Sequence, residues 1–192
     1  MKIIAILFFA LLITHCSYPP VDNKPDTNNQ EQIIQKYLLD SARQYSYNAP
    51  QWDYFIDKGL AEDSTIAYLW QQKAMPLFKK GKYQLGMVYL DKAVLYDSAK
   101  WLSYRAFIKC IFSKSYNEAI LDFEEAIKMD GNSYVMDHSY LFYIALSKLQ
   151  LNKFEAAEAL LKQEIDRTAQ AQGETWVHHL DLFYYGIALY EQ

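Results

Sequence analysis

A short pattern recurs along this chain at a nearly constant spacing. Three segments align, each with a small residue in third place and an aspartate at its end: Asp57–Asp63, Asp91–Asp97 and Glu124–Asp130. The closing aspartates are 34 and 33 residues apart, and the small residues Gly59, Ala93 and Ala126 have the same spacing. A fixed period of this length is typical of helical repeats whose units stack on one another. The sequence therefore predicts an array of helix pairs.

The period and the order of small and bulky residues resemble the tetratricopeptide repeat. In the unit 67–100, these residues occupy the bulky, small and aromatic positions of that family: Trp70, Ala74, Leu77, Tyr83, Gly86, Leu90 and Ala93. The resemblance implies an all-α fold, an α-solenoid of antiparallel helix pairs with about three and a half repeats over residues 31–192. The expected units lie near residues 33–66, 67–100, 101–133 and 138–171, with a half-unit at 179–192.

Several positions depart from the family pattern. Pro76 falls inside the first helix of its unit, where it removes a hydrogen bond and should kink the helix or shift its boundary. The helix around Trp101–Phe112 fits only with a slip of one residue, and Gly131–Asp137 is interpreted as an insertion. Glu164 stands where the family has a small residue, which we interpret as a looser end. A further helix over Ile33–Tyr47 is expected to precede the array.

The composition agrees with a helical core and excludes some partners. Apolar residues make up 52% of the chain and charged residues 22%, which indicates a chain that folds around a core. Seventeen tyrosines stand against only six glycines and five prolines, too few turn-formers for an all-β chain. The net charge is −4, so there is no basic surplus to neutralise phosphates. We therefore expect no nucleic-acid partner.

The N-terminus is typical of a secretion signal. Lys2 precedes an apolar run, Ile3–Ile13, that is too short to span a bilayer but suits a signal peptide over residues 1–15. Cys16 follows, and this arrangement resembles a bacterial lipobox, in which the signal is cut before a cysteine that is then lipidated. His15 departs from the small residue usual before that cysteine. An ordinary signal peptide cut nearby, or a short N-terminal anchor, remains an alternative.

The two cysteines of the chain divide in role. Cys110 lies in an apolar helical stretch and is expected to be a small buried hydrophobe, which leaves Cys16 for acylation, palmitate included. Residues 16–30 are polar and rich in proline, as in a flexible tether. The resemblance implies a lipid-anchored protein of the bacterial envelope. Because Ser17 rather than aspartate follows the cysteine, we expect the outer membrane, and we expect the array on its periplasmic side.

The resemblance also implies a concave groove lined by the first helix of each pair. The residues expected to line it are Tyr68, Gln71, Met75, Phe78, Phe142, Leu146, Phe183, Ile187 and Tyr190. This aromatic and aliphatic lining would suit an apolar or amphipathic peptide or helix of another protein. The alternative is that these side chains belong to the core, covered by the helix Ile33–Tyr47 or by the insertion.

Two histidine groups could serve as metal ligands. In the repeat register His138 and His179 both take the first helical position, each near an aspartate, Asp137 and Asp181. Imidazole and carboxylate together suit a divalent metal. No spaced histidine pair lies on one helix face, so helix-start capping is the simpler interpretation, and we expect no metal and no cofactor.

The sequence favours binding over catalysis. It contains no Gly-x-Ser-x-Gly, phosphate loop, His-Glu-x-x-His or Cys-x-x-Cys motif. The aspartates Asp63, Asp97, Asp122 and Asp130 are expected at helix ends or exposed faces. The leading hypothesis is a membrane-anchored lipoprotein, not an enzyme, that acts as a protein–protein interaction adaptor or assembly factor. The alternatives are an immunity or inhibitor protein that sequesters a toxin, and a metal-dependent enzyme or sensor built on His138 and His179.

Overall fold

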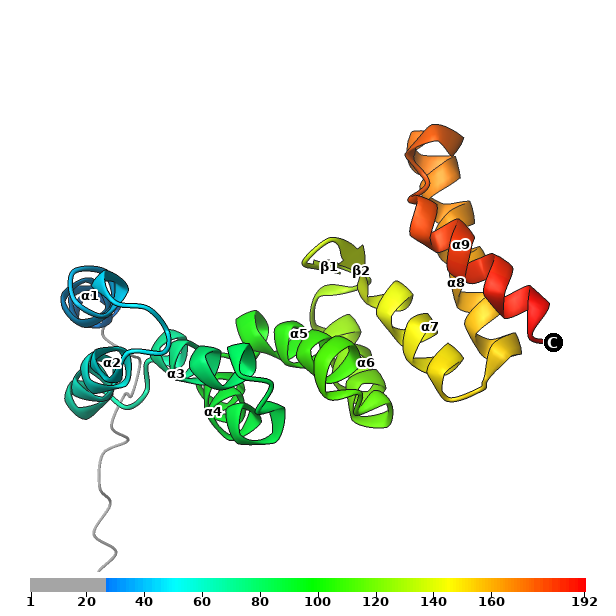
Figure 1. Ribbon diagram of the computed structural model, residues 1–192. Coiled ribbons are helices and arrows are strands. Elements are labelled where there is room, and N and C mark those ends of the chain that lie inside the picture. Colours follow the sequence, from blue (N-terminus) through cyan, green and yellow to red (C-terminus); the bar gives the residue numbers. More distant parts are fainter. Residues whose placement is uncertain (1–26) are drawn as a thin grey trace, which may run out of the picture.

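The computed structural model describes residues 27–192, which form an elongated array of helices (Figure 1). The helices are α1 (Thr27–Ile33), α2 (Pro50–Glu62), α3 (Ala67–Lys79), α4 (Tyr83–Tyr96), α5 (Ser98–Ile108), α6 (Tyr116–Asp130), α7 (Tyr140–Gln150), α8 (Phe154–Gln172) and α9 (His179–Tyr190). A small antiparallel hairpin of β1 (Tyr134–Val135) and β2 (His138–Ser139) lies between α6 and α7. This arrangement confirms the predicted α-solenoid.

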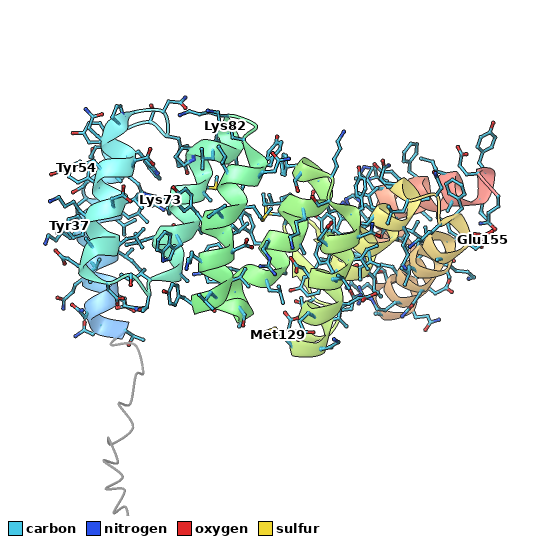
Figure 2. The ribbon with its side chains drawn as sticks, turned by 90° about the horizontal axis from the view of Figure 1, so that it is seen from below. Tyr37, Tyr54, Lys73, Lys82, Met129 and Glu155 are labelled. Atoms are coloured by element: carbon cyan, nitrogen blue, oxygen red, sulfur yellow. The ribbon has the colours of Figure 1, made fainter. Side chains whose placement is uncertain are left out.

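Each helix packs mainly on its neighbours in the sequence, from α2 on α3 through to α8 on α9. The molecule is therefore elongated, and Figure 2 shows Tyr37 and Tyr54 at one end and Glu155 near the other. The core is divided accordingly into three clusters, one around Trp52 and Ile56, one around Phe78 and Leu90, and a larger one around Phe123. Stability therefore comes from the contacts between adjacent hairpins.

The small residues of the repeat allow this close packing. A Cβ atom on Gly86 would lie 2.4 Å from the ring of Phe78, and one on Gly59 would lie 2.7 Å from Cδ1 of Leu69. Real Cβ atoms do not approach other atoms so closely, because the van der Waals repulsion is too large. The small positions read from the sequence are thus contact points between helices.

Pro76 lies inside α3 and is buried, and the helix runs through it to Lys79. A proline has no N–H for the carbonyl four residues before it, here that of Gln72. The indole Nε1 of Trp52, on α2, donates to this oxygen at 3.2 Å. The preceding helix thus satisfies the carbonyl that the proline leaves free.

The helix expected over Ile33–Tyr47 is shorter than predicted. The helix that begins with α1 continues as a π-helical segment, Ile34–Leu39, and ends there, and a 3-10 turn at Ala42–Gln44 follows. The hydroxyl of Ser41 donates to the carbonyl of Lys36 at 2.8 Å and competes with the helical pattern.

Two acidic residues differ from their expected roles. Asp122 is buried rather than exposed, and its carboxylate accepts from the Arg105 guanidinium and from the Lys109 ammonium at 2.7–2.8 Å. Glu164 does not mark a loose end. It is buried, accepts from Nδ2 of Asn132 at 2.8 Å and pairs with Arg167. The carboxylate thus fastens the insertion to α8.

Candidate functional site

An apolar pocket of about 260 Å³ opens between the hairpin α3–α4 and helix α5. Its lining consists of Met75, Phe78, Lys79, Tyr83, Tyr104, Phe107, Ile108, Phe112 and Met136. Eight of these nine side chains are apolar or aromatic, and the ammonium of Lys79 supplies the single charge. Pockets of this kind bury an apolar side chain of a ligand and fix its orientation with a few polar groups.

The pocket wall is held by contacts between aromatic rings. The Tyr83 ring lies 6.5 Å from that of Phe78 and 5.9 Å from that of Phe112. Phe107 meets Phe112 edge to face at 5.7 Å and Tyr143 at 5.5 Å. Such pairs add to the free energy gained from burial. The wall is therefore preorganised, which lowers the entropic cost of binding.

A π-helical turn at the end of α5, Lys109–Ser113, places Phe112 in this wall. The turn accommodates one extra residue, and it ends at Lys114 in the left-handed conformation, with φ 57°. It accounts for the slip of one residue that the repeat pattern required in this helix. The sequence thus signalled the irregularity without giving its geometry.

The insertion between α6 and α7 contributes the last wall. Met136 sits at the tip of the β1–β2 hairpin with φ 55°, is 65% exposed, and still lines the pocket. Figure 1 shows the hairpin beside α5 and α7. The insertion thus contributes one side chain to the pocket. Nothing in the repeat pattern pointed to Met136.

The residues expected to line the groove lie in several different environments. Met75 and Phe78 line the pocket. Gln71 and Phe142 are buried in the core, the first accepting from Nε2 of Gln72 and the second stacked on a histidine ring. Tyr68 is half-buried, stacked on Trp101 at 6.0 Å, with its hydroxyl accepting from Arg43.

The remaining four residues lie beyond this pocket. Leu146 is half-buried against the largest core cluster, and Ile187 lines a second, more polar hollow between α7, α8 and α9. Phe183 and Tyr190 are 58% and 86% exposed on α9. The structure therefore gathers two of the nine expected residues into one pocket. Tyr68 and Gln71 lie on the same helix, α3, but pack against other residues, and the other five lie on α7 and α9.

The histidines meet in a pairing different from the expected one. His138 contacts His178, with ring centroids 4.5 Å apart, whereas His179 is exposed and stacks on the outer side of His178. Asp181 joins His138 and His178, and their ligand-type atoms all lie within 4.8 Å of one another. Burial lowers the pKa of His138, and burial together with the nearby Glu164 raises the pKa of Asp181 to about 6.

The proposed signal peptide, Cys16 and most of the tether lie outside the described residues. Within residues 27–192, no helix has the length and apolar character needed to cross a membrane. Cys110 is buried, as the sequence predicts.

Comparison with known proteins bears on the fold. No protein-family model and no curated protein matches the chain. Among solved structures, the crystal structure of PilW, described as a widely conserved type IV pilus biogenesis factor, is similar with a TM-score of 0.53. The match covers 85% of this chain and 78% of that chain at 17% sequence identity. At this identity the similarity concerns the fold, a helical repeat array of the tetratricopeptide type.

Proposed function

We propose that this protein is a protein-binding adaptor or assembly factor of the bacterial envelope, and that the apolar pocket between α3 and α5 receives an anchor side chain of its partner. The pocket is the observation that carries the proposal. Its aromatic wall is already formed, and aromatic or aliphatic anchors buried in such pockets dominate the binding energy of many interfaces. An amphipathic helix or an extended peptide would supply such an anchor.

The charges beside the pocket define the partner further. Lys79 lines the pocket, and Lys80 and Lys82 follow in the exposed turn between α3 and α4. The loop bearing Lys82 forms one edge of the molecule (Figure 2). Lys79 in the pocket, with Lys80 and Lys82 close to it in the chain, favours a partner segment with acidic residues next to its apolar anchor, because complementary charges fix register and speed association.

The location in the envelope rests on the N-terminal sequence. Lipidation at Cys16 would hold the array at the outer membrane on the periplasmic side, with residues 17–30 as the tether. PilW is a pilus biogenesis factor, and a similar helical array with an assembly task supports the adaptor role. A Cys16→Ala variant should lose acyl labelling and leave the membrane fraction. Unchanged membrane association would refute the anchor while leaving the pocket untested by that result.

Site-specific photocrosslinking tests the pocket. We would place a photoreactive phenylalanine analogue at Phe112, which is 42% exposed in the pocket wall, and in parallel at Leu85, which is 58% exposed on α4 outside the pocket. In cells that express the chain, a discrete crosslinked partner is expected from position 112 and not from position 85. The crosslink should weaken when Lys79→Glu is added and persist with Lys92→Glu, an exposed charge reversal outside the pocket. Equal products from both positions would contradict the proposal.

A further inference from the structure

A second group of side chains lies beside the β1–β2 hairpin, in a hollow that shares no lining residue with the apolar pocket. His138 comes from strand β2, and His178 and Asp181 come from the beginning of α9, about 40 residues later in the chain. Their ligand-type atoms all lie within 4.8 Å of one another. Two imidazoles and one carboxylate from separate segments thus converge on one point, and this N₂O donor set is one that divalent zinc accepts.

One oxygen of this group has no partner. Asp181 is only 5% exposed, and its Oδ1 accepts no hydrogen bond from any described residue. The nearest imidazole nitrogen, Nδ1 of His138, lies 3.8 Å away, which is too far for a hydrogen bond. A buried acceptor without a donor costs free energy, more so for a carboxylate. Two ligand atoms bound to one tetrahedral zinc ion lie about 3.3 Å apart, so a shift of a few tenths of an ångström would let both bind the same ion.

The first histidine is held in place by its surroundings. The ring of His138 stacks on Phe142 with centroids 3.8 Å apart and meets the edge of Tyr143 at 5.9 Å. Its exposure is 5%, so the ring has no freedom to turn toward solvent. A ligand fixed by packing pays little entropy when a metal binds.

The second histidine is held more weakly. Nδ1 of His178 accepts from the backbone N–H of Leu180 at 3.2 Å and thereby caps α9. An imidazole that binds a metal through one nitrogen carries a proton on the other. A metal bound to either nitrogen of His178 would therefore break the hydrogen bond from the Leu180 N–H. Among the described residues, this is the one hydrogen bond between the His178 side chain and the backbone.

The space around these residues suits a hydrated cation. They line a polar hollow of about 140 Å³ together with Asp137, Glu164 and neighbouring polar side chains. The guanidinium of Arg167, the cation nearest to Glu164, is already paired with that carboxylate and bound to the Tyr134 hydroxyl. The remaining carboxylates leave the hollow with a surplus of negative charge, which attracts a divalent ion.

We propose that His138, His178 and Asp181 form a zinc site with a water molecule as fourth ligand. The ion would join the hairpin insertion to the start of α9, two segments whose His138 and His178 rings already lie in contact. It stabilises the packing of α9, the last helix of the described array, and is independent of the apolar pocket. The expected histidine pair, His138 with His179, thus becomes His138 with His178.

Zinc binding to the purified, tag-free Cys16→Ala chain tests the site, since this variant leaves the buried Cys110 as its one thiol. Gel filtration after incubation with zinc sulfate, followed by elemental analysis, should show about one zinc ion per chain. Cobalt(II) in its place should give the intense visible bands of tetrahedral coordination. Failure to retain zinc, together with a cobalt spectrum identical to that of the free ion, would overturn the proposal.

Variants identify the ligands. Asp181→Asn keeps the shape of the side chain, and His178→Gln acts at a half-buried helix start, so both should fold, as circular dichroism will show. Each is expected to weaken zinc affinity by at least about tenfold. His179→Ala is the matched control, an adjacent exposed histidine that should bind zinc as the parent does. Zinc should also raise the thermal midpoint of the parent and of His179→Ala, and a chelator should reverse the rise. Equal affinity in all three variants would place any bound zinc elsewhere and refute the site.

Discussion

Pro76 and Trp52 show how one residue can compensate for another in a neighbouring helix. Because Pro76 has no N–H, the Gln72 carbonyl lacks its helical donor. The indole Nε1 of Trp52 on α2 donates to this oxygen instead, at 3.2 Å. The whole interaction is buried. A repeat interface that relies on shape alone would tolerate phenylalanine at position 52, whereas this one also uses the indole N–H.

We therefore expect Trp52→Phe to lower the free energy of unfolding by about 1–3 kcal/mol, because it leaves the buried carbonyl without a donor. Urea unfolding of the parent, both single variants and the double variant with Pro76→Ala provides the measurement. Alanine at position 76 supplies its own backbone N–H to Gln72, so Trp52→Phe should cost less in that background. Equal costs in the two backgrounds would show that the indole hydrogen bond contributes nothing.

Cys110 illustrates a residue whose chemistry is suppressed by its place in the core. Burial raises the pKa of its thiol from about 9 to about 11, although the Ser147 hydroxyl donates to the sulfur at 3.2 Å. The thiolate is the reactive form, so at pH 8 its population falls about 100-fold relative to the unfolded chain. Because the folded pKa is the higher one, the associated stability is present below pH 9 and is lost as the pH rises toward 11.

Alkylation with iodoacetamide at pH 8, read out by peptide mapping, should label Cys110 at least about 100 times more slowly in the native protein than in guanidinium chloride. Peptide mapping separates this label from that on Cys16. Comparable rates in the two solvents would mean that the region around α5 opens readily.

At the scale of the helix, ion pairs link α5 to both neighbours, and the carboxylate on α6 is buried. Arg105 donates to Asp122 on α6 through Nε and one terminal nitrogen, both at 2.8 Å, and to Asp91 on α4 at 2.9 Å. Lys109 adds a third donor to Asp122. Removing Asp122 is costly because it leaves Arg105 and Lys109, both half-buried, without their shared counter-charge.

Asp122→Asn should therefore destabilise the protein by about 3 kcal/mol, measured as a shift of the urea midpoint. Glu125→Gln is the matched control one turn away, since it breaks the exposed pair with Lys128 and should leave the urea midpoint almost unchanged. A similar shift for both variants would show that Asp122 is worth no more than a surface charge.

The sequence predicts the helices and their small contact residues, because the repeat period forces both. It does not predict Asp122 as a buried residue, since the aspartates of the repeat pattern otherwise lie at helix ends, as with Asp97, whose side chain caps α5. Nor does it identify His178, which precedes α9 as its cap and turns back toward β2. The repeat pattern predicts which way a side chain points only for residues inside the helices. The position of Met136 is not predicted either, because the insertion has no repeat pattern.

At the scale of the whole molecule, the array is nearly one-dimensional. Its three core clusters follow one another along the chain, and α1 and α9 lie at opposite ends (Figure 1). In such an array stability is approximately a sum of unit and neighbour contributions, so an end can open while the remainder stays folded. A local defect should then have local effects.

Native-state hydrogen exchange with two matched variants tests this expectation. Ile56 and Leu161 are both fully buried, one in the N-terminal cluster and one in the largest cluster, on α8. Substitution of either by alanine removes core packing worth about 2–5 kcal/mol. Ile56→Ala should accelerate exchange in α1 and α2 while leaving α7 and α8 unchanged, and Leu161→Ala should do the reverse. Equal acceleration of exchange in all helices by either variant would show that the array unfolds as a single unit. In that case zinc bound near α9 would slow exchange in α2 as strongly as in α8.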